Sequence, residues 1–115
     1  MSMAIERDRA LEIVDRLHAL GPISVTRFFG GAGLVKNGVQ FAFLIKGVLY
    51  LRVDASSRPE FEALGAAPFT YATRKKTVNV ASYYELPDEI AEDTEALLCW
   101  VKKACHAAAA AKSSK

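Results

Sequence analysis

The chain has 115 residues, a formal net charge of +2 and 51% hydrophobic residues. A chain of this length folds as one domain around a modest core, so we expect a single domain over residues 1–115, with 1–3 and 109–115 frayed. The small charge argues against a nucleic-acid-binding domain, which usually carries a clearly basic face, and the composition excludes a disordered chain.

The first predicted element is an amphipathic helix from Ala4 to Leu20, where apolar residues recur at spacings of three and four. Gly21-Pro22 ends this helix, because proline cannot continue the ladder of backbone hydrogen bonds. Residues 23–33 follow as a connector, and they end in a glycine-rich stretch.

Two tight turns organise residues 34–53 into a three-stranded antiparallel meander. Asn37-Gly38 is the preferred pair for a type I′ turn, in which both central positions have positive φ. Lys46-Gly47 predicts the second turn. Because the strands carry apolar residues on both faces, we expect the sheet to be covered in part on both sides.

A short helix and a second hairpin come next. Ser57 and Glu60 have the spacing of a capping box, and Gly65 follows where a left-handed residue often ends a helix. Residues 69–73 and 77–84 flank the turn Arg74-Lys75-Lys76, and their alternation of polarity predicts a two-stranded hairpin.

The last element is a helix that begins near Asp93 or Thr94, after a helical turn at Pro87-Asp88-Glu89. Its apolar stripe consists of Leu97, Val101, Ala104 and Ala108. The predicted fold class is therefore α+β, in the order helix, three strands, helix, two strands, helix. The five strands form one antiparallel sheet with helices covering it.

The glycine-rich stretch is the first candidate site. It precedes a strand, whereas a dinucleotide-binding loop follows a strand and opens a helix. One interpretation is a tight entry to the first strand, where side chains would clash. The alternative is a recognition loop, whose residues are Arg27, Phe28, Phe29, Gly30, Gly31 and Gly33.

A basic patch is the second candidate site. Its residues are Arg74, Lys75, Lys76, Lys102 and Lys103. Basic charge beside aromatic rings suits single-stranded nucleic acid, and tyrosines lie near the turn in the sequence. An ordinary solvated turn has the same composition.

Residues that could carry chemistry are few. Cys99 and Cys105 are six apart on a predicted helix, so they point to different faces and cannot form a disulfide within the chain. Together with His18 and His106 they form no CxxC or HxxxH pair, and no set of nucleophile, base and orienting group is recognisable. We predict no enzymatic activity, cofactor or metal. The absence of an apolar signal segment or membrane span predicts a cytoplasmic protein with reduced thiols.

Several short motifs occur in a fixed order, namely Arg27 to Leu34, Asn37-Gly38, Phe41-Ala42, Leu49 to Arg52, Pro68 to Tyr71, Ser82 to Pro87 and Leu97 to Val101. With these motifs the chain resembles the amino-terminal domain of the TfoX (Sxy) competence-regulator family, over Arg27 to about Ala104. The resemblance implies a stand-alone domain of that type in a bacterium and an arrangement like that of the type III secretion chaperones, which pair as dimers. It also implies transcriptional regulation through protein contacts, without a catalytic residue or cofactor.

These observations lead to three hypotheses of function. The first is a non-enzymatic protein-interaction and regulatory module with an unknown protein partner, which forms a homodimer. The alternative is a nucleic-acid-binding accessory module that uses the basic turn. A third is a small-molecule site at the glycine-rich stretch, and no membrane partner is expected.

Overall fold

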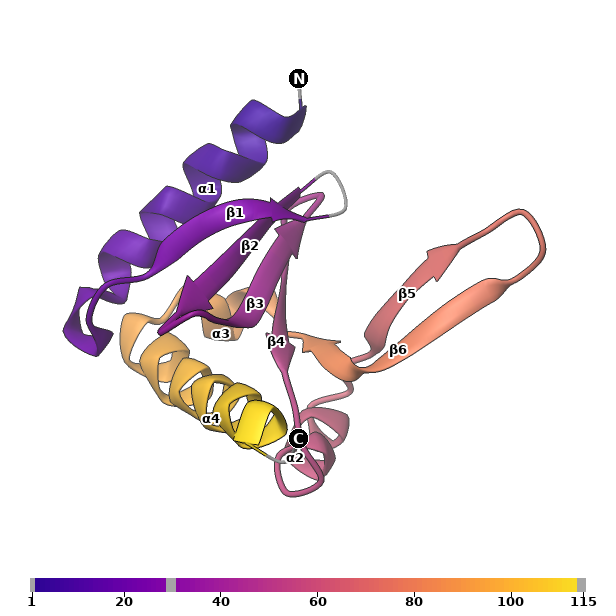
Figure 1. Cartoon of the computed structure of the whole chain (residues 1–115). Helices are drawn as coiled ribbons and strands as arrows, with labels where there is room; N and C mark the ends of the chain where they lie inside the picture. Colours follow the sequence, from indigo (N-terminus) through magenta and orange to yellow (C-terminus); the bar gives the residue numbers. More distant parts are fainter. Residues whose placement is uncertain (1, 29–30, 114–115) are drawn as a thin grey trace.

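The computed structural model of the chain describes residues 2–28 and 31–113 (Figure 1). Within these residues, six strands form one antiparallel sheet in the order β1-β2-β3-β4-β6-β5. Helices α1, α3 and α4 lie on one side of this sheet, and the β5–β6 hairpin leaves it on the other. The elements are α1 (Ser2–Arg16), η1 (His18–Leu20), β1 (Ser24–Phe28), β2 (Gly31–Lys36), β3 (Val39–Ile45), β4 (Val48–Arg52), α2 (Arg58–Ala63), β5 (Pro68–Ala72), β6 (Thr77–Glu85), α3 (Asp88–Ala91) and α4 (Thr94–Ser113).

The α+β class and the single antiparallel sheet are confirmed, but the predicted element order is wrong in two places. The expected connector over residues 23–33 contains strand β1, so the meander has four strands and not three. The helical turn predicted at Pro87-Asp88-Glu89 is present as the short helix α3, which the predicted order did not count as an element. Strand β1 was obscured because the stretch that pairs with it begins with glycines, which are depleted in strands.

The two predicted turns are confirmed. Asn37 and Gly38 have φ values of 53° and 77°, as a type I′ turn requires. Lys46 and Gly47 have φ values of 53° and 81°. These two turns join β2, β3 and β4 in register and so fix which side chains share a face of the sheet.

The main core lies between the sheet and helices α1 and α4. The predicted stripe of α4 is fully buried there, and α1 contributes Ala10, Ile13 and Leu17. A register shift in the β2–β3 pair lets the neighbours Phe41 and Ala42 both enter this core, because the extra residue of a bulge changes the alternation of side chains. The final helix continues through 109–113, where Ala109 and Ala110 are exposed.

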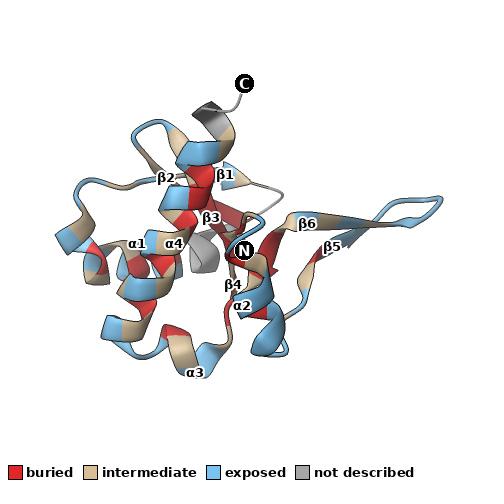
Figure 2. Cartoon of the chain, turned by 90° about the horizontal axis from the view of Figure 1, so that it is seen from below, coloured by how far each residue is buried: buried red, intermediate tan, exposed pale blue. Residues whose placement is uncertain are grey.

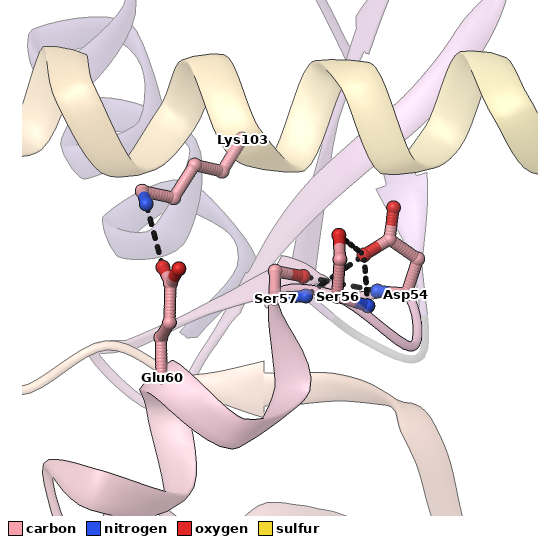
Figure 3. Close-up of polar contacts among 5 residues, drawn as sticks. All are labelled: Asp54, Ser56, Ser57, Glu60 and Lys103. Atoms are coloured by element: carbon pink, nitrogen blue, oxygen red, sulfur yellow. Dashed lines mark hydrogen bonds and ion pairs between the residues drawn. The ribbon is translucent and has the colours of Figure 1, made fainter.

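The amino end of α2 is held by Asp54, and the capping box predicted at Ser57 does not form. Oδ1 of Asp54 accepts hydrogen bonds from the backbone nitrogens of Ser56 and Ser57, at 3.0 and 2.9 Å (Figure 3). Oγ of Ser57 instead accepts from the backbone nitrogen of Asp54, at 3.0 Å. The turn before the helix therefore takes the hydroxyl that a capping box would have used.

None of the helices in the described part of the chain combines the length and apolar character needed to cross a bilayer.

Candidate interaction surface

The side of the sheet opposite α1 and α4 carries a second apolar cluster, which we call the open face. Phe43, Phe69 and Tyr83 are buried in it. Phe28, Ile45, Tyr50 and Val80 are half-buried and pack around them. No helix of the described residues lies over this cluster (Figure 1), so on this side the aromatic rings themselves supply the partial cover of the sheet.

Two glycines of β2 lie on the same side of the sheet as these rings. Ala32 and Leu34 face the main core, so Gly31 and Gly33 face the open side, because side chains alternate along a strand. A Cβ at Gly31 would collide with the backbone carbonyl of Leu44. The predicted clash at the glycine-rich stretch is therefore confirmed for Gly31.

Phe43 is the centre of the aromatic cluster. Its ring centroid lies 4.6 Å from that of Phe28, which reaches it across the glycines of β2, and 4.7 Å from that of Tyr83. The ring of Phe69 meets Phe43 edge-on at 4.9 Å and Tyr50 at 5.0 Å. Phe43 is 0% exposed, so its neighbours on the open face bury it without help from a helix.

The β5–β6 hairpin projects from the open face, and we call its residues 69–80 the arm. The pairing of β5 with β6 shifts register between Pro68 and Phe69, and such irregularities bend a hairpin. Residues 70–77 are all exposed, and Figure 2 shows the distal arm extending into solvent. At its tip, Oγ1 of Thr73 donates to the carbonyl of Lys76 at 3.0 Å.

A groove of about 590 Å³ lies in the corner between the arm and the body, and we call it the corner groove. Ile45, Lys46, Val48 and Tyr50 line it from the body, and residues 69–72 line it from the arm. Burial, together with the nearby Glu85 carboxylate, raises the pKa of the Tyr50 phenol. Tyr50 therefore stays uncharged at neutral pH, and the lining is mainly apolar.

The two candidate sites from the sequence are distributed differently. The described part of the glycine-rich stretch lies in strands, with Arg27 exposed on β1, Phe28 on the open face and Gly31 and Gly33 in β2. Phe29 and Gly30 fall outside the described residues.

The five residues of the basic patch lie in two places. Arg74, Lys75 and Lys76 are exposed at the tip of the arm. Lys102 and Lys103 lie on α4, on the other side of the sheet (Figure 1). The structure therefore does not bring these five cations together.

Lys103 has its own partners on the helical side. Its Nζ is 2.5 Å from Oε1 of Glu60 (Figure 3) and 5.3 Å from the centroid of the Trp100 ring. The hydrogen bond to Glu60 raises the pKa of Lys103. The groove beside this pair, which includes Asp54 and His106, has a volume of about 350 Å³. Two of its charged side chains, Lys103 and Glu60, pair with each other, and its lining holds both signs of charge, so it does not single out a ligand.

Metal-binding and thiol chemistry receive no support from this geometry. Among the described residues, no three histidine, cysteine, aspartate or glutamate side chains gather closely enough to hold a metal ion. Burial raises the pKa of the Cys105 thiol, so the thiol stays protonated at neutral pH and is a weak nucleophile.

Sequence reasoning missed the open face as a surface. The signal was a set of aromatic residues that each lie on a different strand, namely Phe28, Phe43, Tyr50, Phe69 and Tyr83. Their convergence depends on strand β1 and on the bend of the arm, and neither of these was predicted.

Comparison with known proteins agrees with the motifs in the sequence. The family model described as the TfoX N-terminal domain matches residues 15–108. This range runs from the end of α1 through the whole sheet and most of α4. A search of curated proteins finds no match to the chain. Since the family model covers most of the 115 residues, the chain belongs to the TfoX N-terminal domain family.

Proposed function

We propose that this TfoX N-terminal domain is a non-enzymatic module that acts in regulation by binding protein through its open face and arm. The observation that carries the proposal is the corner groove, an apolar concave surface beside a projecting hairpin. Contiguous apolar surface rimmed by polar residues is typical of protein-binding sites. Tyr71, which lines the groove, is 37% exposed, and tyrosine is enriched at the energetic centres of interfaces.

The chemistry of the described residues supports a binding role over catalysis. An activated nucleophile needs a base within hydrogen-bonding reach. Nδ1 of His18 instead contacts the backbone oxygen of Asp15 at 3.0 Å. Cys105 is held as a neutral thiol. Among the side chains that line the corner groove, Lys46 carries a charge at neutral pH. One lysine does not form the set of nucleophile, base and orienting group that catalysis requires.

A nucleic-acid accessory role is the second candidate, favoured by the exposed cations Arg74, Lys75 and Lys76 at the arm tip. Binding of single strands usually adds stacking of bases on open aromatic faces. Here Phe43 and Tyr83 use their rings against each other, and both are buried. This leaves Tyr71 as an exposed ring near the tip, so the geometry favours protein contacts.

Site-specific photocrosslinking in the native cells tests the proposal. A photoreactive amino acid at Thr70, which is exposed and lines the corner groove, is expected to give adducts with protein. The matched control is the same group at Glu12, which is exposed on α1. Nuclease-sensitive adducts at Thr70 would favour the second candidate, and equal labelling from both positions would contradict a binding role for the open face.

A further inference from the structure

We propose that the corner groove is occupied by the arm of a second copy of this chain, so that two β5 strands pair antiparallel in a reciprocal dimer. This inference rests on the proposed function and names the partner. Each protomer would then donate one arm and receive one, as an isologous interface requires.

The lining of the groove shows which side of β5 faces it. Phe69, Thr70, Tyr71 and Ala72 are consecutive, and all four line the groove. Consecutive side chains of a strand point to opposite faces, so four in a row contact one groove only where it runs along the edge of the strand. β6 occupies the other edge of β5. The groove therefore lies along the outer edge of the last strand in the sheet.

An outer strand edge is a template for another strand. The body side of the groove adds the apolar side chains Ile45 and Val48 and the ring of Tyr50. Main-chain pairing along β5 supplies affinity in such strand additions, and the flanking apolar surface supplies specificity. The occupant that fits this site is an extended strand with apolar and aromatic side chains.

The arm itself has these properties. Tyr71 pairs with Val78 and Phe69 pairs with Val80 in its two strands. Two-stranded hairpins are marginally stable in water on their own, yet residues 70–77 extend from the body as an exposed ribbon. A second copy supplies the additional strands that would stabilise this ribbon.

Charge indicates the direction of pairing. Parallel arms would bring together two tips that each carry Arg74, Lys75 and Lys76. Antiparallel arms place each tip beside the base of the other. At the base, the backbone nitrogen of Glu85 donates to the carbonyl of Ala67 at 3.0 Å, so Glu85 lies next to the start of β5, and its carboxylate is near the Tyr50 phenol that lines the groove. Opposite charges then meet at both ends of the paired strands.

Interfaces of stable complexes use roughly 20 to 30 residues from each partner. The arm over residues 69–80 has 12 residues and the body side of the groove adds four, so the paired arms would use 16 residues from each protomer, fewer than a typical stable complex. The same arrangement covers the rings of Tyr50 and Phe69, which line the groove, on both protomers.

A charge-swap experiment tests this proposal, with dimerisation measured by light scattering over a concentration series. Variant one carries Arg74→Glu, Lys75→Glu and Lys76→Glu, and variant two carries Glu85→Lys. In a dimer of either variant alone, the tip of each arm carries the same charge as the base of the arm beside it. The dimer dissociation constant should therefore rise by at least about tenfold. An equimolar mixture should recover the wild-type dimer mass, because both contacts of the mixed dimer are again oppositely charged. Circular dichroism confirms that the variants are folded.

Amide hydrogen exchange of the wild-type chain gives an independent measurement. Exchange at residues 69–72 should slow as the concentration rises through the dimerisation range. A wild-type chain that stays monomeric, a dimer unaffected by both variants, or protection confined to another surface would overturn the proposal. In those cases protein adducts at Thr70 with a different mass would still support the interaction module, so the two proposals fail separately.

Discussion

Replacement of Gly31 by alanine tests how the open face is built. The added Cβ would overlap the backbone carbonyl of Leu44 and lie 2.9 Å from Cγ1 of Ile45. A backbone atom held between strands cannot rotate away, so β2 and β3 would have to separate. Gly33→Ala is the matched control, because its Cβ would meet side-chain ends, Oε1 of Gln40 at 2.6 Å and Oγ1 of Thr26 at 2.8 Å.

The expected magnitudes follow from these neighbours. Overpacking by one methyl group costs about 1–3 kcal/mol in a well-packed site, and Gly31→Ala should be at the upper end. Replacing glycine by alanine also returns roughly 0.5–1 kcal/mol by restricting the unfolded chain. The net loss at Gly31 is therefore about 2 kcal/mol. At Gly33 the two effects nearly cancel, because Gln40 and Thr26 can adopt other rotamers.

Urea denaturation measures both free energies of unfolding. The midpoint for Gly31→Ala should fall while the m value is unchanged, which reports lost stability at constant exposed surface. Gly33→Ala should keep a midpoint close to that of the wild type. Equal losses for the two variants, or a fully stable Gly31→Ala protein, would refute the close approach of β2 to the Leu44 carbonyl.

Three further predictions concern other parts of the structure. Phe43 is at the centre of the aromatic cluster, so Phe43→Ala should lower the free energy of unfolding by about 3–5 kcal/mol. The same variant should have a weaker near-ultraviolet circular dichroism signal. A smaller loss of stability would show that the open face is not packed. The hydrogen bond from the Ser56 hydroxyl is the main cause that lowers the pKa of Asp54, and the hydrogen bond from the Ser57 backbone is the second. The Asp54 carboxylate therefore contributes fully to stability above its pKa in the unfolded chain, and this contribution is lost as pH falls through its lower pKa in the folded chain. Asp54→Asn should therefore weaken the pH dependence of stability in that acid range, and an unchanged profile would contradict this role. Lys103→Met should cost less than about 1 kcal/mol in thermal unfolding, because its ion pair with Glu60 is solvent-exposed, and a larger loss would contradict that estimate.

Features set by local chemistry were predictable from the sequence. Asn37-Gly38 fixes its turn because both positions must adopt positive φ. The apolar stripe of α4, from Leu97 to Ala108, was predictable because a helix buries one face at a regular spacing. In both cases the determining residues lie within a few positions of each other in the chain.

Features set by distant contacts were not predictable. Strand β1 follows from pairing with Gly31 and Gly33, and side chains at those glycines would meet neighbours on the flanking strands β3 and β1. The capping box at Ser57 was lost to competition from Asp54 in the preceding turn. Lys103 was grouped with the basic tip of the arm by charge alone, whereas the fold places it beside Glu60 on the helical side. The corner groove needs both the shift in register after Pro68 and the fold of the meander.

The most direct test of the interaction module is photocrosslinking from Thr70 compared with Glu12, with the adducts identified by mass. The account predicts protein adducts from Thr70, which lines the corner groove, and few from Glu12 on α1. Adducts that include the mass of a second copy of the chain would also support the paired arms. An absence of protein adducts at Thr70, or equal labelling at both positions, would contradict the assignment of the open face as the binding surface.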